Sequence, residues 1–320
     1  LKDEKDMLLL IAYCVTALYP EIPHPVMIWH GQKGTAKTTH MELIKDLLDP
    51  SESNVERGIT KENLPVQLLS NHVCMFDNLR KISPGISDEL CSVITGGCRT
   101  DRKLFTNKEF VVMKFGGVLG FSGINLVAKE PDLLDRSIIF EAKPIDDKDW
   151  KNTKTIREEF RRAKPQILGG LFNLLSDSLR TRDSIVLTQK ARMTDYLEIG
   201  EAVSQSLGNK QGYFQEIYHE NIRRTRINCV SVNVVGSAVI EFMADKPEWV
   251  GMVTELYNEL TEFAINKGII QSKKNSSWVN GANWLSNKLN ELRSELQEVG
   301  IFVDVKRCNA GSKVTIVNKK

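Results

Sequence analysis

The chain has 320 residues, of which 41% are hydrophobic and 26% are charged. This balance excludes a disordered chain, a collagen-like repeat and a disulfide scaffold. The 43 basic and 41 acidic residues give a net charge of +2, so any affinity for nucleic acid must come from local patches. The length predicts a protein of two or three domains.

Cysteine spacing and hydropathy bear on the compartment. The six cysteines form no C-x-x-C pair, which argues against a zinc ribbon and a redox motif. Most of them lie in apolar runs, which predicts reduced, buried thiols and a cytoplasmic location. The longest apolar stretch, residues 7–19, is too short to span a bilayer, and we expect no membrane association. The chain begins with Leu1, which suggests that it is a fragment of a longer polypeptide.

The first part of the chain alternates apolar runs with helical patterns. In chain order we expect a helix over 7–19, a strand over 26–29, a helix over 38–48, a strand over 72–76, a helix over 87–94, and strands over 116–121 and 138–141. Such alternation predicts an α/β fold with a mainly parallel sheet and helices on both faces. We assign this domain to residues 1–148.

Two further patterns follow. Residues 149–246 carry helical patterns at 156–162, 166–179, 201–207 and 234–243, which predicts a helical subdomain. Residues 247–320 are expected to form an amphipathic helix over 249–266, a helix over 282–299 and a two-stranded hairpin over 301–305 and 314–317. Helices followed by a hairpin describe a winged helix. Its mild excess of basic residues leaves DNA binding and protein docking open.

The most specific motif is GQKGTAKTT, which follows the strand at 26–29 and opens the helix at 38–48. Backbone N–H groups of such a loop converge on phosphate oxygens. Lys37 would reach the terminal phosphates of ATP, and the Thr38 hydroxyl would ligate Mg²⁺. Ala36 stands where the pattern asks for glycine, which is tolerable where the backbone is near-helical. The expected nucleotide-binding residues are Gly31, Gln32, Lys33, Gly34, Thr35, Ala36, Lys37, Thr38 and Thr39.

An acidic residue ends the next apolar strand. In HVCMFDNL, Asp77 would hold Mg²⁺ together with Thr38, as the second acidic element of phosphate-loop ATPases does. Asn78 stands where a glutamate usually orients the attacking water, and asparagine can position water but cannot accept a proton. Either another carboxylate supplies this function or hydrolysis is slow.

Two more positions complete the expected catalytic set. Asn125, in SGIN, follows the third apolar strand and would lie beside the γ-phosphate. Arg136, in PDLLDRS, would point across a subunit interface at the nucleotide of a neighbour. The alternative for Arg136 is an ion pair with Asp132 or Asp135.

In this order, GQKGTAKT, FDN, GIN and PDLLDRS resemble the motifs of an AAA+ ATPase, which implies a P-loop NTPase core, a helical lid and, in placement, a C-terminal winged helix. The segment CRTDRKLFTNKEF is similar to the basic insertion of superfamily 3 and minichromosome-maintenance-like helicases. More broadly, the chain resembles replication helicases and primase-associated ATPases of phages and mobile genetic elements.

This resemblance implies roles for further residues. The basic insertion would form a pore hairpin that grips single-stranded DNA through Arg102, Lys103, Phe105 and Lys108. A lid arginine would approach the γ-phosphate. We assign this role to Arg192, with Arg180 and Arg182 as alternatives.

The motifs and the resemblance together predict an ATP-dependent DNA helicase, a ring hexamer with ATP and Mg²⁺ bound between subunits. Its expected partners are single-stranded or forked DNA, further copies of the chain, and a primase or an upstream domain. One alternative is a regulatory ATPase switch with a winged-helix module for docking or DNA binding, and another is a replication initiator that uses ATP only for loading. The basic insertion favours the motor, because a switch needs no pore hairpin.

Overall fold

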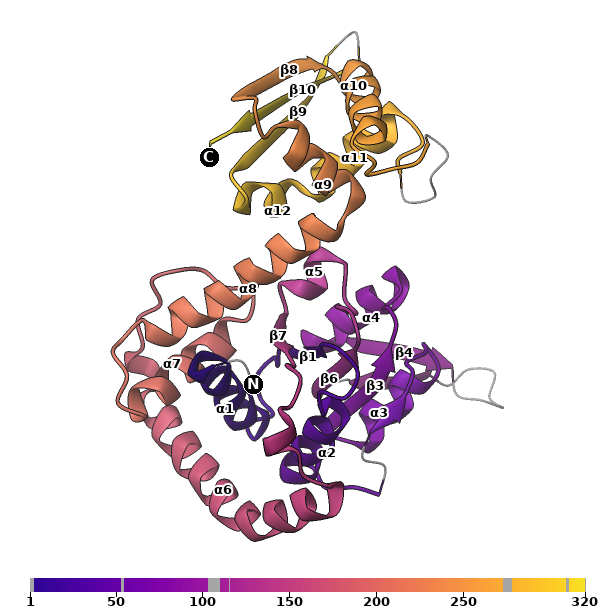
Figure 1. Ribbon diagram of the computed structural model, residues 1–320. Coiled ribbons are helices and arrows are strands. Elements are labelled where there is room, and N and C mark those ends of the chain that lie inside the picture. The colour runs from indigo at the N-terminus through magenta and orange to yellow at the C-terminus, as the bar shows by residue number, and fades with distance from the viewer. Residues whose placement is uncertain are drawn as a thin grey trace. The chain divides into compact units, whose positions relative to one another are not determined.

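The computed structural model describes residues 3–52, 55–102, 110–114, 116–272, 278–308 and 311–319, with the backbone alone for 98–102, 110–114 and Val232. The chain divides into two compact units, Leu1–Ile222 and Arg223–Lys320 (Figure 1). We describe each unit by itself. In the described residues, no helix is both long enough and apolar enough to cross a membrane.

A parallel five-stranded sheet forms the centre of the first unit. Its strand order is β2 (Glu56–Arg57), β3 (Val73–Leu79), β6 (Val118–Gly123), β1 (Val26–His30) and β7 (Ser137–Glu141). The inner strands are apolar and buried on both faces, as expected for a parallel sheet covered by helices. The predicted α/β fold with a parallel sheet is confirmed.

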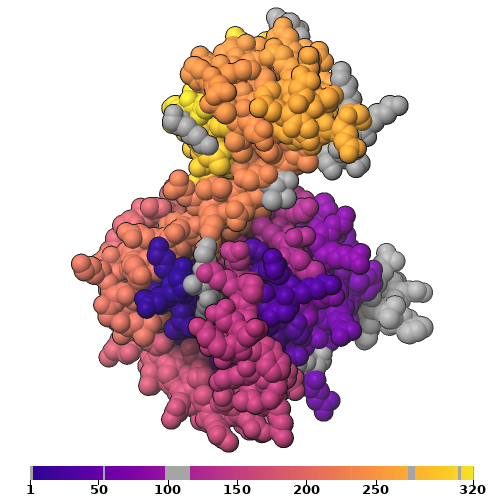
Figure 2. Space-filling model, viewed as in Figure 1, coloured from indigo at the N-terminus to yellow at the C-terminus, as the bar shows by residue number. Residues whose placement is uncertain are grey.

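Helices and one hairpin surround this sheet. The helices are α1 (Glu4–Ala17), α2 (Lys37–Leu48), α3 (Asn63–Ser70), α4 (Pro84–Ile94) and the short α5 (Pro131–Leu134). The hairpin consists of β4 (Cys98–Arg102) and β5 (Phe110–Lys114), which pair antiparallel. The N-terminal turn of α1 reaches the surface (Figure 2). The C-terminal half of α1 is buried, and its Tyr13 hydroxyl donates to the Leu119 carbonyl of β6 over 2.8 Å.

The segment after β7 is helical, as the sequence predicts. It contains the 3₁₀ turns Asp147–Asp149 and Arg182–Ser184 and the helices α6 (Thr153–Thr181), α7 (Thr194–Ser206) and α8 (Tyr213–Val232). Two separate helices were expected over 156–162 and 166–179, but α6 is continuous through Pro165. Pro165 is exposed, so water can satisfy the carbonyl that loses its helical hydrogen bond. Two ion pairs join α6 to α2, Arg157–Glu42 and Lys164–Asp46, each at 2.9 Å.

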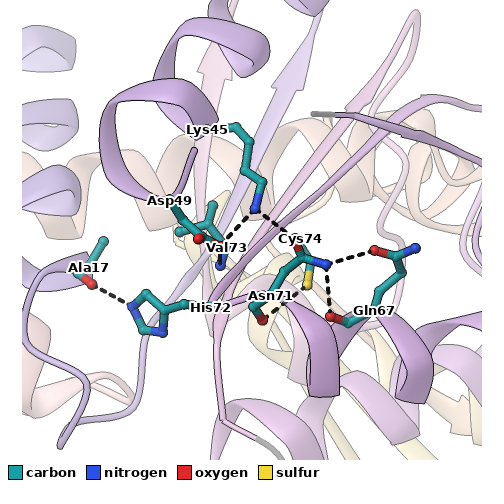
Figure 3. A network of polar contacts seen from close by, with 8 residues as sticks. All are labelled: Ala17, Lys45, Asp49, Gln67, Asn71, His72, Val73 and Cys74. Carbon is teal, nitrogen blue, oxygen red and sulfur yellow. Dashed lines mark hydrogen bonds and ion pairs between the residues drawn. The ribbon is translucent and has the colours of Figure 1, made fainter. Parts of the chain in front are cut away.

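A polar network ties the end of α2 to the start of β3 (Figure 3). The Lys45 side chain is only 1% exposed, and its ammonium donates to Asp49 Oδ2 over 2.7 Å and to Asn71 Oδ1 over 3.0 Å. The same Asp49 oxygen accepts the backbone N–H of Val73 over 2.8 Å. The Asn71 amide donates to Gln67 Oε1 over 3.1 Å, which extends the network to α3. A buried ammonium is thus matched by two acceptors.

The second unit has its own core. It is built from α9 (Val234–Phe242), β8 (Glu248–Met252), α10 (Val253–Asn266), α11 (Ala282–Glu291), α12 (Arg293–Glu298), β9 (Ile301–Cys308) and β10 (Gly311–Asn318). The strands form an antiparallel sheet of order β8-β10-β9. The buried residues of α9 belong to the same hydrophobic cluster as those of the sheet and of α10 and α11.

The structure corrects two predictions in this unit. Residues 249–252 were expected in a helix, but they pair with β10, Trp249 opposite Ile316, so the sheet has three strands instead of two. The helix expected over 282–299 is divided at Leu292 into α11 and α12. Leu285, Leu289 and Leu292 remain buried across this break, so the leucine spacing identifies the buried face but not the continuity of the helix.

Candidate nucleotide site

The GQKGTAKTT loop lies at the carboxyl edge of the sheet, between β1 and α2. Gly31 opens it with a φ of 148°, and a Cβ atom at this position would collide with the Ala142 carbonyl. The Gly31 N–H donates to the carbonyl of Ile124 over 3.1 Å, and the Ala142 N–H donates to that of His30 over 2.8 Å. The start of the loop is therefore fixed between the ends of β6 and β7.

The ammonium of Lys37 lies inside this loop. It donates to the carbonyls of Gly31 and Gln32 over 2.8 and 2.7 Å and to Thr35 Oγ1 over 3.1 Å. Burial lowers the pKa of Lys37, while the nearby Asp77 carboxylate acts in the opposite direction. A cation enclosed by a loop at a helix N-terminus is suited to an anionic ligand such as phosphate.

Thr38 and Asp77 come from different elements and meet directly. The Thr38 hydroxyl, in the first turn of α2, donates to Asp77 Oδ2 over 2.7 Å. The other carboxylate oxygen accepts a hydrogen bond from the hydroxyl of Ser122, a fully buried residue of β6. Ser122 was not among the site residues predicted from the sequence. The available signal was a serine within a buried strand, where a hydroxyl must find a partner.

A bulge in β3 orients Asp77. Phe76 pairs with Phe121 and Leu79 with Gly123, so Asp77 and Asn78 together lie opposite the single residue Ser122. Asn78 has a φ of 57°, and its N–H approaches Ser122 Oγ at 3.3 Å. Asparagine tolerates this left-handed backbone better than most residues do. Asn78 therefore has a backbone reason to be asparagine, independent of any role with water.

These donors fit a magnesium nucleotide. One hydroxyl and one carboxylate, with phosphate oxygens supplying further ligands, are a set that Mg²⁺ commonly takes. The described residues contain no cluster of three or more His, Cys, Asp or Glu side chains arranged to hold a metal. A metal at Thr38 and Asp77 would thus depend on the phosphates of its ligand, as Mg²⁺ sites in nucleotide-binding proteins do.

Ala36 does not have the near-helical backbone that was expected at this position. It caps α2 with a φ of 56° and a ψ of 24°, which is left-handed. An L-residue in this region costs about 1–2 kcal/mol, because its Cβ approaches the following carbonyl oxygen.

Ala36→Gly is therefore expected to stabilise the protein by about 1 kcal/mol, because the Cβ strain disappears. The measurement is the urea midpoint at constant m-value. Ala163→Gly, inside α6, is the matched control and should lower the stability by about 1 kcal/mol, since glycine disfavours a helix interior. A loss of stability in Ala36→Gly would contradict the assignment of strain.

Asn125 lies close to the loop through its backbone. It follows Ile124, whose carbonyl accepts the Gly31 N–H, and it is exposed. The DNA-contact residues are only partly described. Arg102 ends β4 and pairs with Phe110 of β5, while Lys103, Phe105 and Lys108 lie outside the described residues.

Arg136 and Arg192 lie at the opposite edge of the sheet from the loop. Arg136 precedes β7, whose first residue pairs with Val26, so about 16 Å of strand separates this edge from the end of β1. The Arg136 side chain is buried and forms an ion pair with Asp132, and its Nη1 also donates to the Asp132 carbonyl over 2.8 Å. Arg192 contacts the same carboxylate at 3.2 Å. Arg136, foremost, holds the pKa of Asp132 below its ordinary value.

Within one chain, therefore, the structure brings together the loop, Thr38, Asp77 and Asn78, with Asn125 beside them. It places Arg136 and Arg192 together elsewhere, on Asp132. Of the alternative lid arginines, Arg182 is held by Asp195 at 2.6 Å and Glu198 at 3.1 Å, and Arg180 pairs with Asp177 at 2.7 Å.

Comparison with solved structures gives matches at low TM-scores. Among solved structures, the C-terminal region of NrS-1 matches at a TM-score of 0.43 and 16% identity, covering 99% of this chain and 72% of that chain. A JCV helicase structure matches at a TM-score of 0.30 and 13% identity, covering 67% and 64%. No curated protein matches significantly.

The sequence itself is matched by two family models. One, described as actinomycete integrative conjugative element replication protein, matches residues 2–213. The other, described as the C-terminal domain of the same replication protein, matches residues 235–320. Together they account for most of both compact units, and the chain belongs to the family of replication proteins of actinomycete integrative conjugative elements.

Proposed function

We propose that this replication protein is an ATP-dependent helicase of the AAA+ type, which moves along single-stranded DNA. The proposal rests on the hydrogen bond from Thr38 to Asp77, which lies beside the Lys37 ammonium that the loop encloses. Family membership adds the context of DNA replication. The β4–β5 hairpin, inserted between β3 and β6, supplies an element suited to contact with DNA.

ATP would bind with its phosphates on the GQKGTAKTT loop, where Lys37 would contact the terminal phosphates. Thr38 and Asp77 would hold Mg²⁺, with Asp77 oriented by Ser122. The metal would neutralise charge that develops on the phosphates during transfer to water. Asn78 and Asn125, on the same edge of the sheet, would orient that water.

A ring of subunits accounts best for the arginines. Arg136 and Arg192 lie too far from the loop of their own chain to contact a nucleotide there, so they would address the nucleotide of a neighbour. Arg192 is 56% exposed at its side chain, whereas Arg136 is 7% exposed and would first have to leave Asp132. We therefore propose a ring, with the six subunits that the resemblance to AAA+ helicases implies, in which Asp132 holds both arginines until a neighbour binds.

The deciding experiment measures ATP hydrolysis by the full chain with and without single-stranded DNA. We expect DNA to stimulate turnover. The double variant Arg102→Ala/Lys103→Ala should lose the stimulation while basal hydrolysis and nucleotide binding remain. Lys148→Ala/Lys154→Ala, which removes two exposed cations outside the hairpin, is the matched control and should behave as the unaltered protein.

Tight binding of ATP with negligible turnover and no response to DNA would overturn the motor. The regulatory switch, with the second unit as its docking module, would then be the better function. Asn78 is the observation that favours this second candidate, because no carboxylate occupies its position. Stimulated ATP turnover without strand separation would instead favour the initiator that uses ATP only for loading.

A further inference from the structure

Helix α11 of the second unit exposes a row of amide side chains. Its apolar side carries Leu285 and Leu289, which are fully buried in the core. The opposite side carries Asn283, Asn287 and Asn290, all exposed and spaced by four and three residues, so they line one face of the helix. In the described residues, no hydrogen bond engages these three amides. We call these three residues the asparagine row.

An exposed asparagine row has a specific chemical capacity. Each amide offers a donor and an acceptor side by side, and this pair matches the N6 and N7 atoms of adenine in the major groove of DNA. An α-helix fits into that groove. The nearest carboxylate on α11, that of Glu291, follows Asn290 and is paired with Lys288 at 2.7 Å. The row itself is uncharged and is not repelled by the phosphates.

The hairpin of β9 and β10 carries a concentration of positive charge. Lys306 and Lys313 lie directly opposite each other on the two strands, and Arg307 is their exposed neighbour. Like charges directly opposite each other destabilise a strand pair. The single acid of the two strands, Asp304, is shared by Lys306 at 3.0 Å and Arg293 at 2.9 Å. This excess of cations would be compensated by an anionic partner.

The acids of this unit are spread over both of its parts. Six of the ten lie on α9, β8, α10 and the turn between α9 and β8, whereas Glu291, Glu295, Glu298 and Asp304 lie on α11, α12 and β9. The two hairpin strands carry the three exposed cations Lys306, Arg307 and Lys313 against the single acid Asp304. This local excess favours a polyanion as the partner of the hairpin.

Arg293 joins the helices to the hairpin. This first residue of α12 donates through Nε to the carbonyl of Val303 over 2.8 Å and through Nη2 to Asp304 Oδ1 over 2.9 Å. The asparagine row is thus anchored through the α11–α12 pair to the strand that carries Lys306 and Arg307. Hydrogen-bonding groups that can read bases and cations that can contact phosphates are held on adjoining elements.

We propose that α11 and the β9–β10 hairpin form a binding site for double-stranded DNA, in which the asparagine row reads base edges in the major groove and Lys306, Arg307 and Lys313 contact the phosphates. The site is separate from the ATP-dependent motor and would tie the replication protein to a preferred sequence. A duplex is favoured over an acidic peptide because the amides are matched to base edges. It is favoured over a single strand because Trp284, 64% exposed, is the lone large exposed aromatic described on these elements, whereas single-strand sites stack several bases.

The test is selection of bound duplexes from a random-sequence library by the full chain, without ATP, on an Arg102→Ala/Lys103→Ala background that removes the hairpin of the first unit as a competing site. We expect an enriched motif that contains adenines. Asn287→Ala should then weaken binding to the selected duplex by about 5–150-fold and leave binding to unrelated duplexes unchanged. Asn258→Ala, an exposed asparagine on α10, is the matched control and should change neither.

The phosphate contacts have a different signature. Lys306→Ala/Lys313→Ala should weaken binding to all duplexes alike and reduce the slope of log affinity against log salt by about 2. Lys246→Ala/Lys267→Ala, which removes two lysines of the same unit outside the hairpin, is the charge-matched control. The absence of an enriched motif, or equal effects of Asn287→Ala and Asn258→Ala, would overturn the proposal. The proposal would also be overturned if Asn287→Ala or Lys306→Ala/Lys313→Ala weakened only the binding of single-stranded DNA, or only the self-association of the protein. ATP is absent from this experiment, so its result does not depend on whether the protein is an ATP-driven motor.

Discussion

Lys37→Ala is expected to lower the turnover number for ATP hydrolysis by about 10²–10³-fold, the usual effect of removing one preorganised donor to a developing charge. The ammonium lies inside the loop, within 3.1 Å of three oxygen acceptors, so phosphate oxygens that enter the loop would find the cation already in place. A neutral methyl group at this position offers neither charge nor hydrogen bond. The measurement is steady-state release of phosphate at saturating ATP and Mg²⁺.

Two controls separate lost chemistry from lost structure. Lys129→Ala removes an exposed lysine of the same unit and should leave turnover unchanged. The free energy of unfolding of Lys37→Ala, from urea titration, should change by less than about 1 kcal/mol, since the carbonyls that it leaves are accessible to water and each hydrogen bond contributes little net stability. If turnover in Lys37→Ala stays within a few-fold of the unaltered protein, the GQKGTAKTT loop is not the site of ATP hydrolysis.

The loop and its acid were predictable because their chemistry is local or periodic. The spacing of Gly31, Lys37 and Thr38 is contained in nine consecutive residues, between a strand and a helix that hydrophobic pattern alone identifies. Asp77 was predictable because it ends an apolar strand, and parallel strands deliver their carboxyl ends to one edge.

Ser122 and the backbone at Asn78 were not predictable. Both depend on a bulge, and a bulge is a property of the pairing between two strands, here of Asp77 with Ser122, which is 45 residues further along the chain. In the sequence, Asn78 reads as a replacement for a catalytic glutamate. In the structure, its φ of 57° supplies a conformational reason for asparagine.

The second unit shows the same limit for secondary structure. Trp249 and Val250 fit a helical apolar pattern as a continuation of α10, but their pairing with β10 places them in a strand. Short apolar runs are ambiguous between helix and strand, and tertiary pairing decides between them. The leucines at 285, 289 and 292 identified the buried side correctly, because burial depends on spacing and survives the break between α11 and α12.

The largest effect on stability is expected for Asp49→Ala. This change removes the carboxylate that compensates the Lys45 ammonium, which is 1% exposed, and leaves the cation with the Asn71 amide oxygen alone (Figure 3). Removing one partner of a buried ion pair typically costs about 3–5 kcal/mol, because the remaining charge is buried without compensation. The measurement is the free energy of unfolding from urea titration at neutral pH.

Lys45→Met provides the matched comparison. It removes the buried charge itself, and the Asp49 carboxylate that remains is 25% exposed and keeps the N–H of Val73 as a donor. We therefore expect a smaller loss than in Asp49→Ala. The double variant should be more stable than Asp49→Ala alone, because no buried cation is left unpaired. Equal losses of stability in Asp49→Ala and Lys45→Met would show that an unpaired Lys45 ammonium is not the cause of the loss in Asp49→Ala.

The pH dependence follows from the same contacts. Burial alone would raise the pKa of Asp49, but the hydrogen bonds from Lys45 and from the N–H of Val73 outweigh it and hold the pKa below its ordinary value of 3.8. A carboxyl group with a lowered pKa contributes stability that is fully present above the ordinary pKa and is lost as the pH falls through the value in the folded state. The difference in stability between the unaltered protein and Asp49→Ala should therefore shrink as the pH is lowered below about 4.

Lys37→Ala and Asp49→Ala should also differ in which property they leave unchanged, the stability or the turnover. Helix α2 begins with Lys37 and Thr38 and ends at the Asp49 network, while β3 begins at this network and carries Asp77 near its other end. Lys37→Ala is expected to abolish most turnover at nearly unchanged stability. Asp49→Ala is expected to lower stability, and at low temperature, where the protein remains folded, to retain most of its turnover. Loss of turnover in folded Asp49→Ala would mean that the network also sets the distance between Thr38 and Asp77.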